Sequence, residues 1–456
     1  MEINPLIFRE YDIRGVVDRD LTPAIVKSLG QGFGTHMIRL GLGRVVVGAD
    51  GRLSSPAFRE ALIEGLLSTG LDIADIGLCP TPVYYFSLYH LDREGGMMIT
   101  GSHNPPEFNG FKVSIGKSTI FGEQIRQLGR LIQNGEFVRG HGTLSRQDMM
   151  SSYLEFIKQK MDVQKRLKVV IDAGNGTAGL VAGPLLRALG AEVKELYCEV
   201  DGCFPNHFPD PTIPENLKDL IGRVKAIHAD LGIGYDGDAD RIGVVDDQGN
   251  ILWGDQLMIL FSRQILAERK GAAIVGEVKC SQNLYDDIAA HGGRGIMWKT
   301  GHSLIKEKMR EEGAALGGEM SGHLFFADRY FGYDDAIYAS CRLLELLSKT
   351  EKRLSELLTD IPKTVITPEI RVSCPDEIKF RVVERVKEEL RKDFVIIDVD
   401  GVRVRFDHGW GLVRASNTQP VLVLRFEAPT QEQLEQIRRL IEAKVKTAIS
   451  TFRLSP

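Results

Sequence analysis

Residues 44–50 read RVVVGAD, and residues 55–70 read SPAFREALIEGLLSTG. The first stretch is a short apolar run rich in β-branched side chains, which predicts a buried strand, and the second repeats apolar residues at helical spacing. Two more apolar runs follow, LDIADIG at 71–77 and GGMMIT at 95–100. A strand, a helix and further strands in this order predict an α/β unit with a largely parallel sheet.

The same order of elements occurs twice more along the chain. It begins again at Leu167 with LKVVIDAGNG, and a third time after Gly254 with a helical pattern over 255–271. Beyond about residue 362 the order changes to short strands around a long amphipathic helix over 376–392. We therefore expect an α/β protein of three similar domains with mixed, largely parallel sheets, plus a smaller C-terminal α+β domain. The expected domains are 1–147, 148–250, 251–362 and 363–456.

Composition excludes several classes of function. The 456 residues are 43% hydrophobic and 26% charged, which is typical of a globular chain with several domains. A net charge of -5 argues against nucleic acid or an anionic membrane as the main partner. Neither a membrane span nor a secretory signal is evident, so we expect a cytoplasmic protein. The six thinly spread cysteines are expected to be reduced, mostly buried thiols.

Four loops at the ends of predicted strands carry more polar residues than a turn requires, and such loops are where α/β sheets place ligands. The first is TGSHNPPEFNGFK at 100–112, which Pro105 and Pro106 stiffen. A stiff loop of this kind suits Ser102 as a nucleophile. The alternative is that Ser102 only caps the local backbone, as isolated serines in turns more often do.

The second loop, DGDADR at 236–241, places three aspartates at alternate positions. Three carboxylates this close repel one another unless a cation neutralises them. A calcium loop is excluded because its sixth position would be Arg241 instead of Gly and its twelfth would be Asp247 instead of Glu. A hard divalent ion such as Mg²⁺ is the favoured ligand, and an acidic surface turn is the alternative.

The third and fourth loops offer groups suited to a sugar and to a phosphate. GGEMSGH at 317–323 alternates an acceptor, a hydroxyl and an imidazole on a glycine-rich backbone, a pattern that fits paired sugar hydroxyls. RASNTQP at 414–420 offers a guanidinium, hydroxyls and an amide, which together could cradle a phosphate. For each loop taken alone, a solvated polar turn is the alternative.

With all four loops present in this order, the sequence resembles the α-D-phosphohexomutases, and most closely their phosphomannomutase/phosphoglucomutase branch. The resemblance covers essentially the whole chain and includes EYDIRG at 10–15, MWKTGHSLIK at 297–306 and GWGLVRASNTQP at 409–420. It implies four domains around a central cleft. It also implies reversible phosphoryl transfer between the 1- and 6-positions of hexose phosphates, of mannose, glucose or both, through a phosphoserine and a hexose 1,6-bisphosphate intermediate.

The resemblance implies a role for each site residue. Ser102 would carry the phosphoryl group and, with Asp236, Asp238 and Asp240, would bind Mg²⁺. The other implied catalytic residues are Lys112, Arg241 and His302, of which Lys112 and His302 are candidates for proton transfer. The implied substrate-binding residues are Tyr11, Arg14, Lys279, Gly301, Glu319, Ser321, His323, Arg414, Ser416, Asn417 and Thr418. Glucose 1,6-bisphosphate is the implied activator, and we expect a monomer or small homo-oligomer that binds hexose phosphates.

Two positions depart from the family pattern. Ala239 stands where the family more often has Gly, a change that is tolerable if the φ angle of Ala239 is negative. Gln256 stands where close relatives often have Arg, which puts one auxiliary basic contact in doubt.

Three other functions stay open. Phosphoglucosamine mutase is the nearest, although Met320 replaces the Gln usual in its sugar loop. A metal-dependent sugar-phosphate phosphatase could use the same serine and carboxylates to transfer phosphate to water. A noncatalytic sugar-phosphate binding protein would keep the phosphate cradle without the chemistry.

Overall fold

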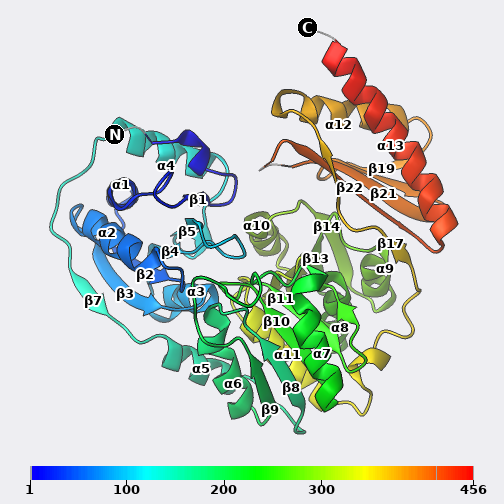
Figure 1. Ribbon diagram of the computed structural model, residues 1–456, viewed down its shortest axis with the longest axis horizontal. Helices are drawn as coiled ribbons and strands as arrows, with labels where there is room; N and C mark the ends of the chain where they lie inside the picture. The colour runs from blue at the N-terminus through cyan, green and yellow to red at the C-terminus, as the bar shows by residue number, and fades with distance from the viewer. Residues whose placement is uncertain (1–2, 417–418, 455–456) are drawn as a thin grey trace.

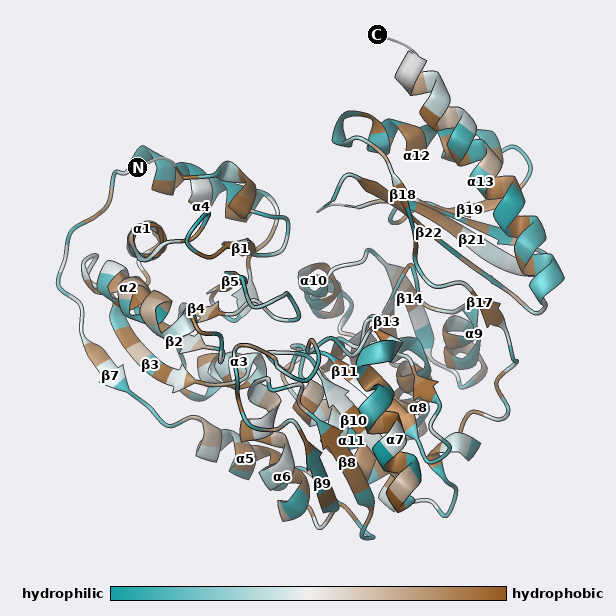
Figure 2. Ribbon diagram, viewed as in Figure 1, coloured by the Kyte–Doolittle hydropathy of each residue, from teal (hydrophilic) through white to brown (hydrophobic). Residues whose placement is uncertain are grey.

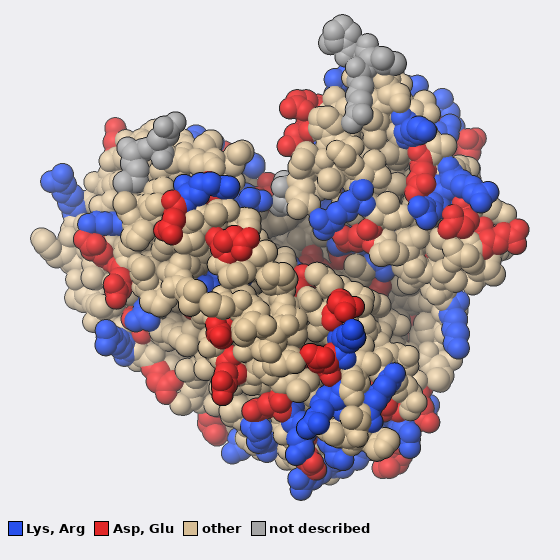
Figure 3. All heavy atoms as spheres, in the orientation of Figure 1, with Lys and Arg blue, Asp and Glu red and all other residues tan. Residues whose placement is uncertain are grey.

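Four separate sheets follow one another along the chain (Figure 1). The structure is a computed structural model that describes residues 3–416 and 419–454. Three domains with mixed sheets and helices precede a smaller C-terminal domain, which confirms the predicted fold class. The space-filling view shows a hollow between the N-terminal domain and the C-terminal domain, in agreement with the expected central cleft (Figure 3).

The first sheet has a parallel centre and an antiparallel edge. Strand β2 (Arg44–Ala49) is parallel to its neighbours on both sides, and its valines alternate between two cores. Val46 packs with residues of α3 (Thr81–His90), whereas Val45 and Val47 pack with the helices of the other face. Burial on both faces explains the continuous apolar run. The sheet order is β1 (Ile13–Val16), β5 (Phe108–Ile115), β4 (Gly95–Ile99), β2, β3 (Asp72–Leu78), β7 (Leu144–Arg146), with β6 (Ser118–Thr119) on β5; the other helices are α1 (Pro23–Arg39), α2 (Ser55–Leu67) and α4 (Glu123–Asn134).

The second and third sheets repeat this plan with fewer strands. The second has the order β12 (Ile251–Leu252), β11 (Ile242–Asp246), β10 (Leu231–Tyr235), β8 (Lys168–Asp172), β9 (Glu192–Leu196), with helices α5 (Met150–Lys158), α6 (Ala182–Ala188) and α7 (Lys218–Ile227). The third has the order β14 (Arg294–Trp298), β13 (Ala273–Glu277), β15 (Leu316–Gly318), β16 (Leu324–Phe326), with helices α8 (Gly254–Glu268), α9 (Gln282–Ala290), α10 (His302–Glu312) and α11 (Ala336–Ser348).

The fourth sheet is antiparallel throughout its described pairs. Its order is β17 (Val365–Ile366), β22 (Val421–Ala428), β21 (Gly409–Ala415), β20 (Val402–Phe406), β19 (Val395–Ile397), with β18 (Ile370–Ser373) also on β22. Two helices pack on it, α12 (Asp376–Leu390) and α13 (Gln431–Leu454), and the hydrophilic residues of α13 give it its teal outer stripe (Figure 2).

Each of the four polar loops connects two antiparallel neighbours of a sheet. The serine loop joins β4 to β5, and the aspartate loop joins β10 to β11. The glycine-rich loop joins β15 to β16, and the loop that begins after Arg414 and Ala415 joins β21 to β22. The four loops therefore occupy equivalent hairpin positions, one in each sheet.

The hydrophobic core divides the molecule into two parts. One cluster runs through the first three domains and includes Tyr84, Tyr153, Ile233 and Phe326. The C-terminal domain has a core of its own between its sheet and its two helices. The first three domains therefore share an apolar cluster, whereas the fourth has its own core and meets the third through a small apolar cluster of Val278, Trp410 and Leu412.

Polar contacts join the C-terminal domain to the third. Arg403 donates to the carbonyl oxygens of Val278 and Cys280, at 2.6 and 2.8 Å, and its guanidinium lies 3.7 Å from the centroid of the Trp410 ring. The Ser281 hydroxyl crosses the same interface to donate to a carboxylate of β22, at 2.6 Å. These contacts fix the C-terminal domain at the edge of the third sheet.

Two observations bear on the expectations from composition. All six cysteines are free thiols, and Cys79, Cys280, Cys341 and Cys374 are buried, as expected. Among the described residues, no helix is both long enough and apolar enough to cross a membrane.

The crossing of α1 and α2 leads to a prediction about stability. A Cβ atom at Gly30 would lie 2.6 Å from the backbone oxygen of Leu62, so Gly30→Ala must push the two helices apart. We expect a loss of about 1–3 kcal/mol in the free energy of unfolding, measured by urea denaturation. Gly222→Ala on α7 is the matched control, because a Cβ there meets nothing within 4 Å and should be neutral or slightly stabilising. Equal stability of Gly30→Ala and wild type would contradict this account.

Candidate active site

The serine loop and the aspartate loop meet at the boundary between the first and second domains. The Ser102 hydroxyl donates to Oδ2 of Asp236 at 2.9 Å, and its oxygen also lies 3.1 Å from Nδ1 of His103. Both Ser102 and Asp236 are buried. The structure therefore places the predicted nucleophile in direct contact with the predicted metal ligands.

Arg52, which directly follows β2, holds the serine loop in shape. Its guanidinium donates to backbone oxygens of the loop at 2.6–2.9 Å, namely those of Ser102, Asn104, Pro105 and Phe108. Its Nε lies 3.2 Å from Asp50, and the side chain is almost completely buried. Because one guanidinium donates to carbonyls at four positions of the loop, Arg52 is the main support of the loop.

Glycines allow the two loops to come this close. A Cβ at Gly237 would lie 2.5 Å from the carbonyl oxygen of Ser102, and a Cβ at Gly101 would lie 2.4 Å from the guanidinium of Arg52. Ser102 itself has a φ of 49°, in the left-handed region that non-glycine residues rarely adopt. The hydroxyl is thus held in place by a strained backbone that the surrounding contacts maintain.

Asp236, Asp238 and Asp240 form a buried carboxylate cluster. Each offers an oxygen within 4.8 Å of the others. Within the described part of the chain, Oδ1 of Asp238 and Oδ1 of Asp240 are buried and have no hydrogen-bond partner. Burial and the charges of its two neighbours hold the pKa of the Asp236 carboxyl well above its usual range. A hard divalent cation fits this donor set, because it would supply the charge and the partners that these oxygens lack.

Lys112 on β5 supplies part of the neutralising charge. Its Nζ contacts Asp240 and lies 2.9 Å from Oδ2 of Asp238. Although burial disfavours the ammonium form, these two carboxylates raise the pKa of Lys112 well above its usual range. Lys112 is therefore a fixed positive charge beside the carboxylates in this arrangement.

Ala239 does not have the negative φ angle at which an alanine would be tolerated in place of glycine, because its φ is 62°. The turn needs a left-handed residue here, since the Asp240 N–H and the Arg241 N–H both donate to Oδ1 of Asp236, at 3.0 and 3.1 Å. An alanine in this region costs about 1–2 kcal/mol. The loop keeps its form despite Ala239, at that energetic cost.

Gln256 makes a structural contact within its own helix. Its Oε1 accepts a hydrogen bond from the Trp253 N–H at 3.0 Å, which caps the first turn of α8. Close relatives often have Arg at this position, whereas in this chain Gln256 caps a helix.

The glycine-rich loop lies across from the carboxylates. Oε1 of Glu319 accepts from the Gly301 N–H at 2.6 Å, and Nε2 of His323 accepts from Nε of Arg241 at 2.8 Å. Ser321 lies at the tip of the loop and is half-buried. The Arg241–His323 contact joins the third domain to the aspartate loop of the second, whereas the Glu319–Gly301 hydrogen bond lies within the third domain.

Tyr11 and His302 meet where the first and third domains face each other. The Tyr11 hydroxyl donates to the carbonyl oxygen of Thr300 at 2.9 Å, and its ring would collide with a Cβ at Gly301. Burial and the nearby Lys306 ammonium hold the pKa of His302 well below its usual range, so this imidazole is neutral.

Two further predicted substrate-binding residues, Arg14 and Arg414, come from the first and fourth domains. Arg14 donates to Asn104 of the serine loop at 2.6 Å. Arg414 is buried, and its Nε lies 3.0 Å from Oδ2 of Asp400, which also accepts from the Thr300 N–H at 3.1 Å. Arg414 therefore lies beside the third domain.

The predicted phosphate cradle is only partly described. Lys279 pairs with Glu369 at 2.7 Å and Ser416 is buried, whereas Asn417 and Thr418 lie outside the described residues. No contact joins Lys279 or Arg414 directly to the carboxylate cluster within the described residues. The two predicted halves of the site therefore lie in different domains.

Four residues that contact the site were not among those predicted from the sequence. Arg52 supports the serine loop, and the Thr81 hydroxyl donates to Oδ2 of Asp238 at 2.6 Å. Asp334 and Lys306 form a buried ion pair at 3.0 Å beside His302. Arg52 could have been found as a charged residue that follows a buried strand, and Asp334 as an acidic residue in the loop after β16. Nothing in the sequence singled out Thr81.

Comparison with known proteins agrees with the four-domain site. Family models for phosphoglucomutase/phosphomannomutase match along the chain: alpha/beta/alpha domain I over 5–139, domain II over 151–249, domain III over 253–365 and the C-terminal domain over 369–444. A phosphomannomutase/phosphoglucomutase of Pseudomonas aeruginosa is 47% identical over 98% of this chain and 96% of its own length. A phosphoglucomutase of Neisseria gonorrhoeae is 43% identical over 97% of each chain.

A solved structure shows the same arrangement of domains. The phosphoglucomutase/phosphomannomutase family protein of Burkholderia thailandensis superimposes with a TM-score of 0.94 at 42% identity, over 98% of each chain. The fold and site define a phosphohexomutase, an enzyme of the isomerase class that moves a phosphoryl group within a hexose phosphate. The chain belongs to the phosphoglucomutase/phosphomannomutase family.

The support that Arg52 gives the serine loop is testable. Arg52→Lys retains the charge but cannot satisfy the same set of carbonyls, so we expect both turnover and stability to fall, the latter by about 3–5 kcal/mol. Thermal unfolding and steady-state kinetics measure the two effects. Arg59→Lys is the control, because Arg59 lies on α2 and pairs with Asp75 at 3.0 Å, away from the loop. Wild-type turnover in Arg52→Lys would show that the loop does not need its guanidinium.

Proposed function

We propose that this enzyme interconverts the 1- and 6-phosphates of mannose and of glucose through a phosphoryl group carried by Ser102. The observation that carries the proposal is the 2.9 Å contact between the Ser102 hydroxyl and a buried carboxylate trio with unpartnered oxygens. The identities to named mutases over the full chain support the same reaction.

The proposed reaction has two transfers. In the first, the P–O bond to Oγ of Ser102 breaks and a new P–O bond forms to the free hydroxyl of the hexose phosphate, whose proton passes to a general base. Oγ of Ser102 takes up a proton as its P–O bond breaks. The product is a hexose 1,6-bisphosphate, which turns around in the cleft. In the second transfer, the other P–O bond of the bisphosphate breaks and the phosphoryl group passes to Oγ of Ser102, which gives up that proton. The sugar oxygen left behind takes up a proton from the general acid. The isomeric hexose phosphate leaves, so atoms and charge balance over the cycle.

Asp236, Asp238 and Asp240 are the residues that would hold Mg²⁺. When bound there, the ion would neutralise charge that develops on the transferring phosphoryl group. Arg241 and Lys112 lie beside these carboxylates and add fixed positive charge. We assign the ion as Mg²⁺ because the site offers oxygen donors and because the family is metal-dependent.

The remaining predicted residues receive the sugar and its distant phosphate. Glu319 and Ser321 border the cleft and offer groups for vicinal hydroxyls. Arg414 and Ser416 would hold the phosphate that does not react, so that one anchor serves both orientations of the bisphosphate. Tyr11, Arg14, Lys279 and His323 would line the space between them.

Several finer points stay predictions from the sequence. They are activation by glucose 1,6-bisphosphate, a cytoplasmic location, and a monomer or small homo-oligomer. Phosphatase activity is the second reaction that the same serine and carboxylates could support, and it would differ in transferring the phosphoryl group to water.

Product analysis separates the mutase from the phosphatase. We expect the enzyme with Mg²⁺ and a trace of glucose 1,6-bisphosphate to convert mannose 1-phosphate and glucose 1-phosphate to their 6-phosphates, followed by ³¹P NMR. Ser102→Ala should fold and lack this turnover, whereas Ser145→Ala on β7 should retain it. Release of inorganic phosphate without the isomer would favour the phosphatase, and turnover by Ser102→Ala would exclude Ser102 as the carrier.

The role of Arg414 predicts a loss of binding. Arg414→Ala removes a charge-assisted contact to phosphate, so we expect substrate binding to weaken by about 1.5–3 kcal/mol. Isothermal titration of hexose 6-phosphate measures it. Arg405→Ala is the control, since Arg405 is an exposed residue of β20 in the same domain. Unchanged affinity in Arg414→Ala would remove this residue from the phosphate site.

A further inference from the structure

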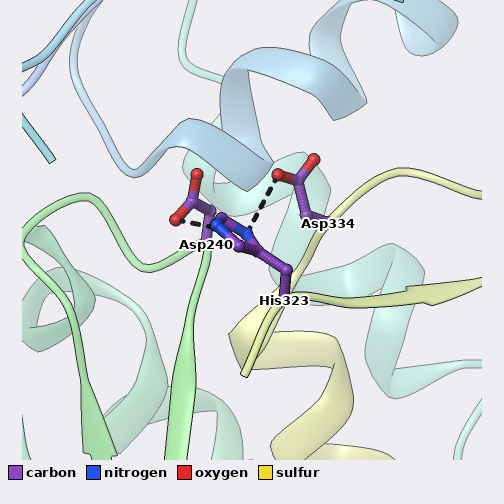
Figure 4. Close-up of side chains that lie close together, drawn as sticks. All are labelled: Asp240, His323 and Asp334. Carbon is purple, nitrogen blue, oxygen red and sulfur yellow. Dashed lines mark ion pairs between the residues drawn. The ribbon is translucent and has the colours of Figure 1, made fainter. Parts of the chain in front are cut away.

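Two imidazoles face one carboxylate oxygen beside the aspartate loop. Nδ1 of His323 lies 3.3 Å from Oδ2 of Asp334 and 3.7 Å from Oδ1 of Asp240 (Figure 4). Nδ1 of His302 lies 3.7 Å from the same Oδ2 of Asp334, and the centroids of the two imidazole rings are 5.6 Å apart. Oδ2 of Asp334 thus lies close to the rings of both His302 and His323.

Asp334 is itself firmly held. Nζ of Lys306 lies 3.0 Å from Oδ1 of Asp334 and 3.2 Å from the hydroxyl oxygen of Tyr85. The backbone of Asp334 pairs with Phe325 in an isolated bridge, and the side chain is completely buried. With Oδ1 oriented by Lys306, Oδ2 is left to face the imidazoles.

The contact with Arg241 indicates which nitrogen of His323 carries the proton. Nε of Arg241 can only donate, and it lies 2.8 Å from Nε2 of His323. Nε2 must therefore accept, which places the proton of a neutral imidazole on Nδ1, the atom that faces Asp334 and Asp240. A carboxylate behind Nδ1–H is the arrangement that stabilises this tautomer.

Asp240, His323 and Asp334 also have the spacing of a metal site. A metal bound to Nδ1 would require the ring proton to move to Nε2, where it would face the N–H of Arg241. Metal ligation would thus cost the Arg241 hydrogen bond. Within the described residues Nδ1 of His323 and Oδ2 of Asp334 make no hydrogen bond, so only the Arg241 contact at Nε2 opposes a metal here.

We propose that Asp334 is a positioning residue that holds His323 in the Nδ1–H form. The inference rests on the proposed function and deepens it, because Asp334 would keep Nε2 of His323 an acceptor beside Arg241. Among the described residues Asp334 makes no hydrogen bond or ion pair with the carboxylate trio, although one of its atoms lies within 4.8 Å of an oxygen of Asp240, so its hydrogen-bonding influence on the site would pass through the imidazoles.

The test is Asp334→Asn. Because Lys306 only donates, the amide oxygen should turn to Lys306 and the amide NH₂ to the imidazoles, which then need an acceptor at Nδ1. We expect kcat to fall about 10²-fold or more while KM stays within about threefold. Spectra of ¹⁵N-labelled histidine should show His323 as Nδ1–H in the wild type and as Nε2–H in the variant, with signals assigned by His→Gln variants.

The control is the adjacent Asp335→Asn. Asp335 is also fully buried but accepts from the hydroxyls of Tyr153 and Tyr330, so we expect near-normal kcat and an unchanged His323 spectrum. If Asp334→Asn fails to fold, Lys306→Met carries the test, with an expected loss of kcat of about tenfold.

Several results would overturn the proposal. One is wild-type kcat in Asp334→Asn, or in Lys306→Met if it replaces that variant. Another is the Nε2–H form of His323 in the wild type, or an Nδ1–H form in both proteins. Absence of mutase turnover in the wild type would count against the proposed function alone, because the histidine spectra do not depend on the reaction.

Discussion

The buried negative charge of Asp236, Asp238 and Asp240 is the constraint around which the site is built. Burying three carboxylates is costly unless positive charge and donors surround them. The second domain supplies backbone N–H groups of its own loop, whereas the first supplies Lys112 and the hydroxyl of Ser102. Neither domain alone completes this environment. The apolar cluster that the two domains share holds them next to each other. A cation at the same place would add the charge that is still lacking.

One structural plan positions all four loops. Each connects antiparallel neighbours in a sheet, and in the first three domains those strands border a parallel centre. Binding groups are commonly found on loops that a rigid sheet positions in this way. The C-terminal domain differs because it has its own core and meets the third domain through contacts such as those of Arg403 and Ser281. Movement of this domain over a bound sugar would therefore leave the other three domains packed as they are.

The sequence predicted the fold class because strand and helix periodicities repeat three times, and it found the loops because Ser102, the aspartates and Glu319 lie at strand ends. It could not predict contacts between residues far apart along the chain. Arg52, Thr81 and Asp334 act on residues 50, 157 and 11 positions away, respectively, and such distances carry no local pattern. The positive φ angle of Ala239 could not be predicted from the sequence either, because the hydrogen bonds to Asp236 determine it. The positions of Glu319 and Arg414 followed from their loops, but their partners Gly301 and Asp400 did not.

Locating the phosphoryl group on the protein would decide whether Ser102 is its carrier. The enzyme is incubated with Mg²⁺ and glucose 1,6-bisphosphate, and peptide mass spectrometry then identifies the modified residue. We expect one phosphoryl group per chain on Ser102, which is lost when a hexose 1-phosphate is added and reappears in the bisphosphate. Phosphate on an aspartate or on another serine, or a phosphoserine that does not exchange with the sugar, would contradict this mechanism.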